Sequence, residues 1–246
     1  MRQTYIIAAA AALPAIAMAT PASALLELYG NVDGSVITCS DGAACDINPA
    51  PGILEIAPTT LNGVFFTGEI AASTSPGGPD ILNNSVLDVI NTTGVTKHLN
   101  LIVSDTGFAG PVSEFAAAGS GTWQNTIGSS ITLNWFADPA NAQGADGSGS
   151  TPGTLLTTFS NTATSIVQSF SNGTAIGPFV AAGPASLTMQ ATYDLDPFGQ
   201  LINRGMTVEL TAVPEPSTWM MLALGFVGLG YAAVRRSAKD RSALAI

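Results

Sequence analysis

Leu187-Thr188-Met189-Gln190-Ala191-Thr192-Tyr193 is the stretch that decides the fold class of this chain. Apolar and polar residues alternate in it, as they do in Ile131-Thr132-Leu133-Asn134-Trp135 and in Met206-Thr207-Val208-Glu209-Leu210-Thr211. Successive side chains of a β-strand point to opposite faces, so each stretch predicts a strand with one apolar face toward a core.

Other short stretches predict further strands, because Gly, Pro, Asn and Ser separate them at short intervals. They are Leu26 to Tyr29, Ser35 to Thr38, Ile53 to Ile56, Val64 to Ile70 and Leu155 to Phe159. Val86 to Ile90 and Leu99 to Val103 flank a loop that contains Gly94, which predicts a β-hairpin. The sequence therefore predicts one all-β domain over residues 25–212, a single β-sandwich of about eight to ten strands, of the jelly-roll or Ig-like type.

One long stretch, Ala140 to Gly153, has no strand character and is rich in Gly and Ser. Such a composition is polar and flexible, which indicates a plain surface loop that does not pack. A lid that binds a partner is the alternative interpretation.

The N-terminus has the features of a secretory signal peptide. Residues 1–24 begin with one cation, Arg2, continue as an apolar run and end on Ala22-Ser23-Ala24. A basic start, an apolar stretch and small residues before the cut are typical of such peptides. We expect signal peptidase to cleave after Ala24, with Ala19 as the alternative.

The predicted globular region is strongly acidic. Residues 25–213 contain two cationic side chains, Lys97 and Arg204, against fifteen carboxylates, which gives a formal net charge of −13. This charge repels nucleic acid and anionic lipid head groups, so we expect the domain to bind neither. Neutral polysaccharide and divalent cations remain compatible with it.

The only two cysteines, Cys39 and Cys45, are separated by Ser-Asp-Gly-Ala-Ala. Export to an oxidising compartment favours a local disulfide bond between them, and two reduced thiols are the alternative. The chain-entropy model gives so small a ring about 2 kcal/mol, which fixes one loop and not a whole domain.

Candidate catalytic residues are few. The chain has a single histidine, His98, and it contains neither a Gly-x-Ser-x-Gly motif nor a phosphate-binding glycine loop. A Ser/His/Asp set with Asp88 or Asp105 is one interpretation of His98, but a solvated histidine beside Lys97 is favoured. We expect no catalytic residues and no cofactor. The paired carboxylates of a glycoside hydrolase stay open, since their separation is set in three dimensions.

Two acidic segments are candidates for a calcium site. Asp194 and Asp196 have the opening spacing of a calcium loop, but Phe198 occupies a ligand position, which favours a simple turn. A calcium site at Asp41 and Asp46, beside the cysteines, stays open.

Two tryptophans are candidates for a sugar-binding platform. Trp135 is in phase with Ile131 and Leu133 and is therefore predicted to lie in the core, which leaves Trp123 as the free candidate. An ice-binding face would need regular threonine ladders, and the threonines of the predicted strands are too irregular for one.

The C-terminal residues 213–241 combine three elements. Pro214-Glu215-Pro216 ends the last strand, and its two prolines force an extended geometry that suits a protease active site. An apolar run follows, and a helix over about 217–234 would be about 27 Å long, at the short end of a membrane span. A basic cluster over 235–241 then begins with Arg235 and Arg236. The positive-inside rule places this cluster and residues 242–246 in the cytoplasm.

These elements closely resemble the PEP-CTERM sorting domain, in the motif Pro214-Glu215-Pro216, the glycine-containing apolar helix and the basic end that starts at Arg235. The resemblance implies cleavage near the motif by an exosortase, a membrane-embedded cysteine protease of Gram-negative bacteria. It also implies an inner-membrane precursor that is delivered to the cell surface or extracellular matrix. The tail continues beyond Arg236, where many members end sooner.

The family is associated with exopolysaccharide and biofilm, which implies a structural or adhesive protein whose partners include extracellular polysaccharide. A calcium- or carbohydrate-binding module is the alternative, followed by an ice-binding protein and, more distantly, a glycoside hydrolase.

Replacing Pro214-Glu215-Pro216 by Ala-Ala-Ala should block processing while leaving the apolar run and the basic cluster intact. In a host with an exosortase, the variant should accumulate as a longer membrane-bound form, whereas the wild type reaches the surface or matrix fraction. Mass spectrometry and fractionation measure this. Equal mature mass and equal release of the two proteins would contradict the prediction.

Overall fold

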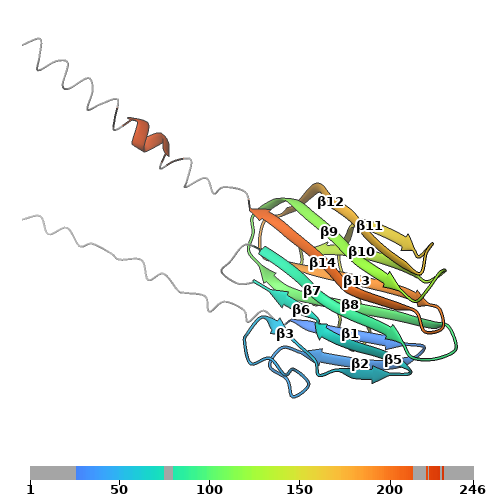
Figure 1. Cartoon of the computed structure of the whole chain (residues 1–246). Coiled ribbons are helices and arrows are strands. Elements are labelled where there is room, and N and C mark those ends of the chain that lie inside the picture. Colours follow the sequence, from blue (N-terminus) through green and yellow to red (C-terminus); the bar gives the residue numbers. More distant parts are fainter. Residues whose placement is uncertain (1–25, 75–79, 213–219, 221, 228, 230–246) are drawn as a thin grey trace, which may run out of the picture.

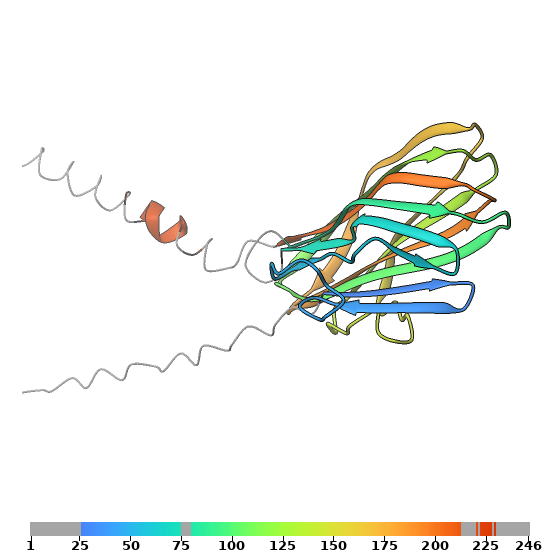
Figure 2. The ribbon, with the colours of Figure 1, turned by 60° about the horizontal axis from the view of Figure 1, so that its bottom comes forward.

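The computed structural model describes residues 26–74, 80–212, 220, 222–227 and 229. Over these residues fourteen strands form two antiparallel sheets packed face to face (Figures 1 and 2). The strands are β1 (Glu27–Val32), β2 (Ser35–Ser40), β3 (Ile53–Leu54), β4 (Thr59–Leu61), β5 (Val64–Glu69), β6 (Ala71–Ser73), β7 (Asp80–Asn91), β8 (Lys97–Phe108), β9 (Val112–Gln124), β10 (Ser130–Asp138), β11 (Thr154–Thr162), β12 (Val167–Ala181), β13 (Ala185–Leu195) and β14 (Gln200–Ala212).

The predicted targeting features lie outside the described residues. This holds for the cleavage site at Ala24, for the motif Pro214-Glu215-Pro216 and for Arg235 and Arg236. Of the predicted membrane helix, residues 220, 222–227 and 229 are described, and they are helical. Among the described residues, no helix has the length and apolar character needed to cross a membrane.

The two sheets have different sizes. The six-stranded sheet has the order β11-β10-β13-β8-β1-β2, and the eight-stranded sheet has the order β12-β9-β14-β7-β5-β4. The short strand β6 also pairs with β7, and β3 pairs with β6. The last strand, β14, therefore lies between β9 and β7, away from both edges of its sheet.

Strands β7 to β14 are nested pairwise along the chain. β7 pairs with β14, β8 with β13, β9 with β12 and β10 with β11, all antiparallel. The pairs β7–β14 and β9–β12 lie in the eight-stranded sheet. The pairs β8–β13 and β10–β11 lie in the six-stranded sheet. This is a jelly roll, which β1–β2 and β4–β5 widen at one edge. The all-β sandwich is confirmed, and of its two predicted types the chain adopts the jelly roll.

Alternation of apolar and polar residues builds the core. In β10 the side chains of Ile131, Leu133 and Trp135 are buried between the sheets, and the intervening residues face outward. The neighbouring position in the opposite sheet is Gly119 in β9, where an added Cβ would lie 2.5 Å from the Leu133 side chain and 3.2 Å from the Trp135 ring. Leu133 and Trp135 together therefore leave no room for a side chain at Gly119.

The predicted hairpin between Val86–Ile90 and Leu99–Val103 is wrong. Both segments are strands, but β7 belongs to the eight-stranded sheet and β8 to the six-stranded sheet. The loop between them crosses the sandwich and is organised by Asn91, whose side-chain amide donates to the carbonyl oxygens of Val95, Leu195 and Asp196. Glycine in a short loop does not by itself distinguish a hairpin from such a crossing.

The loop from Ala140 to Gly153 packs on the protein, contrary to the expectation from its composition. Gly144 N–H donates to Ser104 Oγ at 3.0 Å, and Ala145 is buried in a small cluster with Tyr29 and Ile102. Gly149 has a φ of +68°, and a Cβ there would lie 2.6 Å from the Tyr29 ring. The glycines therefore allow close approach to the outer side of the six-stranded sheet.

The disulfide bond between Cys39 and Cys45 is present, with the two Cα atoms 5.9 Å apart, which confirms that prediction. It closes the loop that follows β2, while Cys39 itself is buried in the main core.

One buried lysine joins the two sheets at the edge that β1–β2 and β4–β5 widen. The Nζ atom of Lys97 lies 3.2 Å from Asp33 Oδ2 and donates to Asn62 Oδ1 at 3.3 Å. Asp33-Gly34 and Asn62-Gly63 form the tight turns of the β1–β2 and β4–β5 hairpins, and all four residues have positive φ, as type I′ turns require. We refer to these contacts of Lys97 as the Lys97 bridge.

The bridge also acts on the charge of Asp33. Burial acts to raise the pKa of this carboxyl, but the backbone N–H of His98 and the Lys97 ammonium outweigh it and lower the pKa below its usual value. Asp33 therefore stabilises the fold when ionised, and this stabilisation is lost as the pH falls through its lowered pKa.

Replacing Lys97 by Met keeps the apolar stem but removes the bridge, and we expect a loss of about 1 to 2 kcal/mol in the free energy of unfolding. Urea unfolding at neutral pH measures it. The matched control is Asp194→Asn, which breaks the exposed contact with His98 and should cost less. A larger loss for the control would contradict a role for the bridge in joining the sheets.

Candidate functional site

The outer side of the six-stranded sheet carries an uncharged array of hydroxyl and amide side chains. They occupy alternate positions of five adjacent strands, so that their neighbours in sequence fill the core. We call this array the hydroxyl–amide face; it consists of Asn31, Asn100, Thr132, Asn134, Thr158, Ser160, Gln190 and Thr192.

The sheet register aligns part of this face in a row that crosses five strands. Ser160 is paired with Thr132, Thr132 with Thr192, Thr192 with Asn100, and Asn100 with Asn31. Neighbouring strands are about 4.8 Å apart, so the row is about 19 Å long. Its length suits an extended ligand with repeated polar groups.

Hydrogen bonds hold the amide groups of the face in place. Asn134 Nδ2 donates to Gln190 Oε1 at 3.2 Å, and Gln190 Nε2 donates to Asn100 Oδ1 at 3.0 Å. The Thr132 and Ser160 hydroxyls are 2.9 Å apart. Within the described part of the chain, Asn134 Oδ1 and Asn100 Nδ2 have no partner, so an acceptor and a donor remain at the two ends of this relay.

Two features limit the face. At one end, His98 Nδ1 lies 2.6 Å from Asp194 Oδ1, and both side chains are exposed. At the other end, the loop from Ala140 to Gly153 covers the sheet through Ser104 and Tyr29. The face is therefore an open strip and not an enclosed pocket.

The fold does not bring His98 together with the carboxylates that the sequence suggested as its partners. His98 contacts Asp194 instead of Asp88 or Asp105. Ser130 Oγ donates to the other oxygen of Asp194, at 3.3 Å, so the hydroxyl is held by the carboxylate and not by the imidazole. A serine activated by histidine needs the hydroxyl hydrogen-bonded to the imidazole, and this geometry does not provide it.

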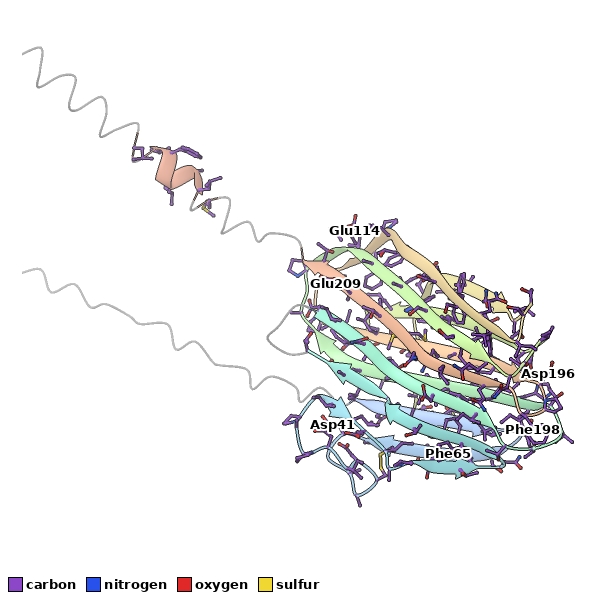
Figure 3. The ribbon with its side chains drawn as sticks, viewed as in Figure 1. Asp41, Phe65, Glu114, Asp196, Phe198 and Glu209 are labelled. Atoms are coloured by element: carbon purple, nitrogen blue, oxygen red, sulfur yellow. A yellow bond between two sulfur atoms is a disulfide. The ribbon has the colours of Figure 1, made fainter. Side chains whose placement is uncertain are left out.

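The two calcium candidates lie at opposite ends of the sandwich, as the labels of Asp41 and Asp196 in Figure 3 show. Both carboxylate oxygens of Asp46 accept backbone hydrogen bonds, from Gly42, Asn48 and Glu55. Burial acts to raise the pKa of Asp46, but these hydrogen bonds outweigh it and lower the pKa. The described residues contain no group of three or more His, Cys, Asp or Glu side chains placed to hold a metal ion.

Asp196 belongs to the four-residue connection from β13 to β14, as the turn interpretation predicts. Gly199 N–H donates to the Asp196 carbonyl oxygen at 2.9 Å, and Phe198 has a φ of +60°. Figure 3 shows Asp196 at one end of the sandwich.

The proposed sugar platform on Trp123 is wrong. Trp123 is 0% exposed, its ring centroid lies 6.1 Å from that of Phe170 in a tilted arrangement, and its Nε1 donates to Asn161 Oδ1 at 2.8 Å. Trp135 is also 0% exposed, which confirms its predicted place in the core. Both of these indoles serve packing, so neither is available to a ligand on the surface.

One carboxylate is buried without hydrogen bonds to both of its oxygens. Asp105 in β8 is 0% exposed, and one of its oxygens has no hydrogen-bond partner. Burial and, to a smaller extent, the nearby charge of Asp41 raise the pKa of Asp105 to about 6, against hydrogen bonds from Ser73 and the Thr106 backbone that lower it. Ionised Asp105 therefore destabilises the fold at neutral pH.

Residues 212–237 match the family model for the PEP-CTERM protein-sorting motif. The chain carries a PEP-CTERM sorting motif. The match starts at the last residue of β14 and includes Pro214, Glu215 and Pro216, so the resemblance seen in the sequence is confirmed. The PEP-CTERM motif implies an exported precursor that an exosortase processes.

Solved structures similar to this chain include several β-proteins. TmCBM61 in complex with β-1,4-galactotriose is 8% identical with a TM-score of 0.28, over 61% of this chain and 81% of that chain. The CBM22-1 xylan-binding domain from Paenibacillus barcinonensis Xyn10C is 13% identical with a TM-score of 0.29, over 65% and 88%. The enzymatically active domain of bacteriophage CBA120 tailspike protein 4 is 10% identical with a TM-score of 0.30, over 61% and 20%. These TM-scores are low, and no ligand of this chain follows from them. No curated protein matches the chain.

The hydroxyl–amide face was not recognised as a site in the sequence. The signal was present in the polar positions of the alternating strands, such as Thr132 and Asn134 in one and Gln190 and Thr192 in another. What the sequence lacks is the strand order that places them side by side.

Asp105→Asn should remove one contribution to the pH dependence of stability. Because the pKa of Asp105 is raised in the folded state, its protonated form stabilises the fold below about pH 4, and this contribution disappears as the pH rises through about 6. The variant should therefore gain up to about 3 kcal/mol relative to wild type between pH 4 and pH 7.

Urea unfolding at the two pH values measures this gain, with Asp88→Asn on the solvent side of β7 as the control for loss of one charge. An Asp105→Asn protein whose difference from wild type is the same at both pH values would contradict the assignment.

Proposed function

We propose that this protein is a non-enzymatic adhesive component of the cell surface or extracellular matrix that binds neutral polysaccharide through its hydroxyl–amide face. The PEP-CTERM motif supports delivery to that compartment. The observation that carries the binding proposal is the relay from Asn134 through Gln190 to Asn100, which is partly exposed on the outer side of the six-stranded sheet.

The chemistry of the face fits sugar hydroxyl groups. Asn and Gln side chains present both donors and acceptors, and Ser and Thr hydroxyls act as either. A sugar hydroxyl has the same dual capacity, so each group of the ligand finds a complementary group without any ionic contact. The relay also fixes the amide orientations before binding, which reduces the entropy lost on association.

The charge of the domain selects among polysaccharides. The face itself is uncharged, but residues 25–213 have a net charge of −13. Long-range repulsion therefore disfavours polymers of uronic acids or sulfated sugars and leaves neutral polymers unaffected.

A non-enzymatic role is supported by the arrangement of titratable groups. Asp105 is buried away from the face, and His98 and Asp194 are paired with each other at its end. Neither group reaches the relay that would contact the ligand. The proposed activity is therefore retention of the polymer and not its cleavage.

Gln190→Ala should weaken retention on immobilised neutral polysaccharide by about 5- to 10-fold in dissociation constant, because it removes the centre of the relay and two hydrogen bonds. Affinity electrophoresis in gels that contain the polymer measures this. Gln190 is partly exposed, so circular dichroism should stay unchanged.

The matched control is Thr207→Ala on the outer side of the eight-stranded sheet, which should bind as wild type does. Retention on a polyuronate at low salt should be weaker than on the neutral polymer. Equal binding by Gln190→Ala and wild type, or cleavage of the polymer during the run, would contradict the proposal.

A further inference from the structure

One edge of the sandwich is open. β11 ends the six-stranded sheet and β12 ends the eight-stranded sheet, and the two strands lie side by side (Figures 1 and 2). A groove of about 590 Å³ runs between them and is lined by apolar side chains that include Leu155, Ile176 and Phe179. Leu156 and Phe159 of β11 pack on the main core but are only partly buried. The core is therefore incompletely closed at this edge.

The opposite edge, formed by β2 and β4, is closed in a different way. The Lys97 bridge ties the β1–β2 turn to the β4–β5 turn there. Among the described residues, no ion pair joins β11 to β12. The two edges of the same sandwich thus differ in how they exclude water.

The open edge contains no charge. Neither β11 nor β12 contains an Asp, Glu, Lys or Arg residue, although residues 25–213 carry fifteen carboxylates. Glu114 is the carboxylate in register with this edge, opposite Pro178, and Figure 3 shows it at a corner of the molecule. Natural edge strands usually carry charged residues that prevent pairing with another strand. Their absence here leaves the edge able to pair.

Large apolar side chains are exposed on the same strand. Ile176 is 65% exposed and Val180 is 73% exposed, and both residues line the groove. The strand has a bulge at Asn172 and Gly173, where Asn172 Oδ1 accepts from Gly119 N–H at 2.6 Å. The bulge bends the strand but leaves the unpaired backbone groups of Gln168 to Ser171 and of Thr174 to Gly177 at the edge.

We propose that this open edge is a self-association surface, at which β11 and β12 meet the same edge of a second copy of the chain. A two-fold axis sets β12 antiparallel to its own copy, which gives partners to unpaired N–H and C=O groups in the regular stretches of the strand. The same axis brings Ile176 and Val180 of one copy against the apolar edge of the other.

Charge favours a second copy over other occupants. Two copies with a net charge of −13 repel each other over most of their surface, so they can meet closely only where carboxylates are absent. A charged partner protein would find no opposite charge on β11 or β12. An uncharged edge with unpaired backbone groups is matched by the same edge of another molecule.

Self-association through this edge does not depend on polysaccharide binding. It would, however, make the binding of a polysaccharide tighter. Strand pairing about an axis perpendicular to the sheet places the two hydroxyl–amide faces on the same side of the dimer. Two sites on one particle bind a repeating polymer more tightly than either site alone.

Analytical ultracentrifugation of the exported and processed protein tests the proposal. Wild type should associate at micromolar concentrations, and Ile176→Lys should raise the dissociation constant by at least about 100-fold, because association would press a lysine of each copy against the apolar edge of the other. The matched control, Thr207→Lys, adds the same charge to the outer side of the same sheet and should associate as wild type does. Val180→Lys repeats the test at a second exposed site, so that a folding defect of one variant does not decide the outcome.

Hydrogen exchange provides a second measurement. Backbone amides at the free edge of β12 should become protected as the wild-type concentration rises, and should remain unprotected in Ile176→Lys. A wild-type protein that stays monomeric at all concentrations would overturn the proposal. So would lysine variants that associate as tightly as wild type, or a Thr207→Lys control that loses association equally.

Discussion

Burial of one side of each central strand against the opposite sheet is the interaction on which the structure depends. Trp135 of the six-stranded sheet reaches across to Gly119 of the eight-stranded sheet, and Trp123 lies in the same core. Truncating either tryptophan to alanine would cost about 3 to 5 kcal/mol, a large part of the stability of an ordinary domain. Because the inner sides are committed to this packing, recognition is left to the outer sides and to the strand edges.

The sequence predicts those strands whose alternation is regular, and it misses those whose shape is set by the opposite sheet. β10, β13 and the second half of β14 are readable because an apolar residue fills every second position. β9 was not predicted, since Ala117, Gly119 and Gly121 occupy its inner positions. A Cβ on Gly121 would lie 2.9 Å from both Leu201 and Phe170, so large neighbours dictate its small residues. β12 was missed for a related reason, because Asn172, Gly173 and Pro178 interrupt its pattern at its bulges.

The functional features divide in the same way, into those encoded by a local stretch of sequence and those that depend on strand pairing. Charge, the PEP-CTERM motif and the disulfide bond are local features of the chain, and each could be identified from residues close in sequence. The hydroxyl–amide face depends on the pairing of β10 with β13 and of β13 with β8, which no local pattern encodes. The burial of Trp123 could not be predicted from its small and polar neighbours in sequence. Phe170, whose ring lies near the indole, comes from another strand.

The place of β14 in the middle of its sheet has a consequence for the timing of export. Strand β14 is the last to leave the translocation machinery, yet β7 and β9 can be joined in one sheet only through it. Pairing of β7 with β14 closes a loop of more than a hundred residues, and contacts so distant in sequence form slowly. The PEP-CTERM match begins at the final residue of that strand, so folding of the domain and cleavage of its tail act on adjoining peptide segments. A tail that is cut before β14 has inserted would release a chain with an unfilled gap in its sheet, whereas a slow protease leaves the domain time to close.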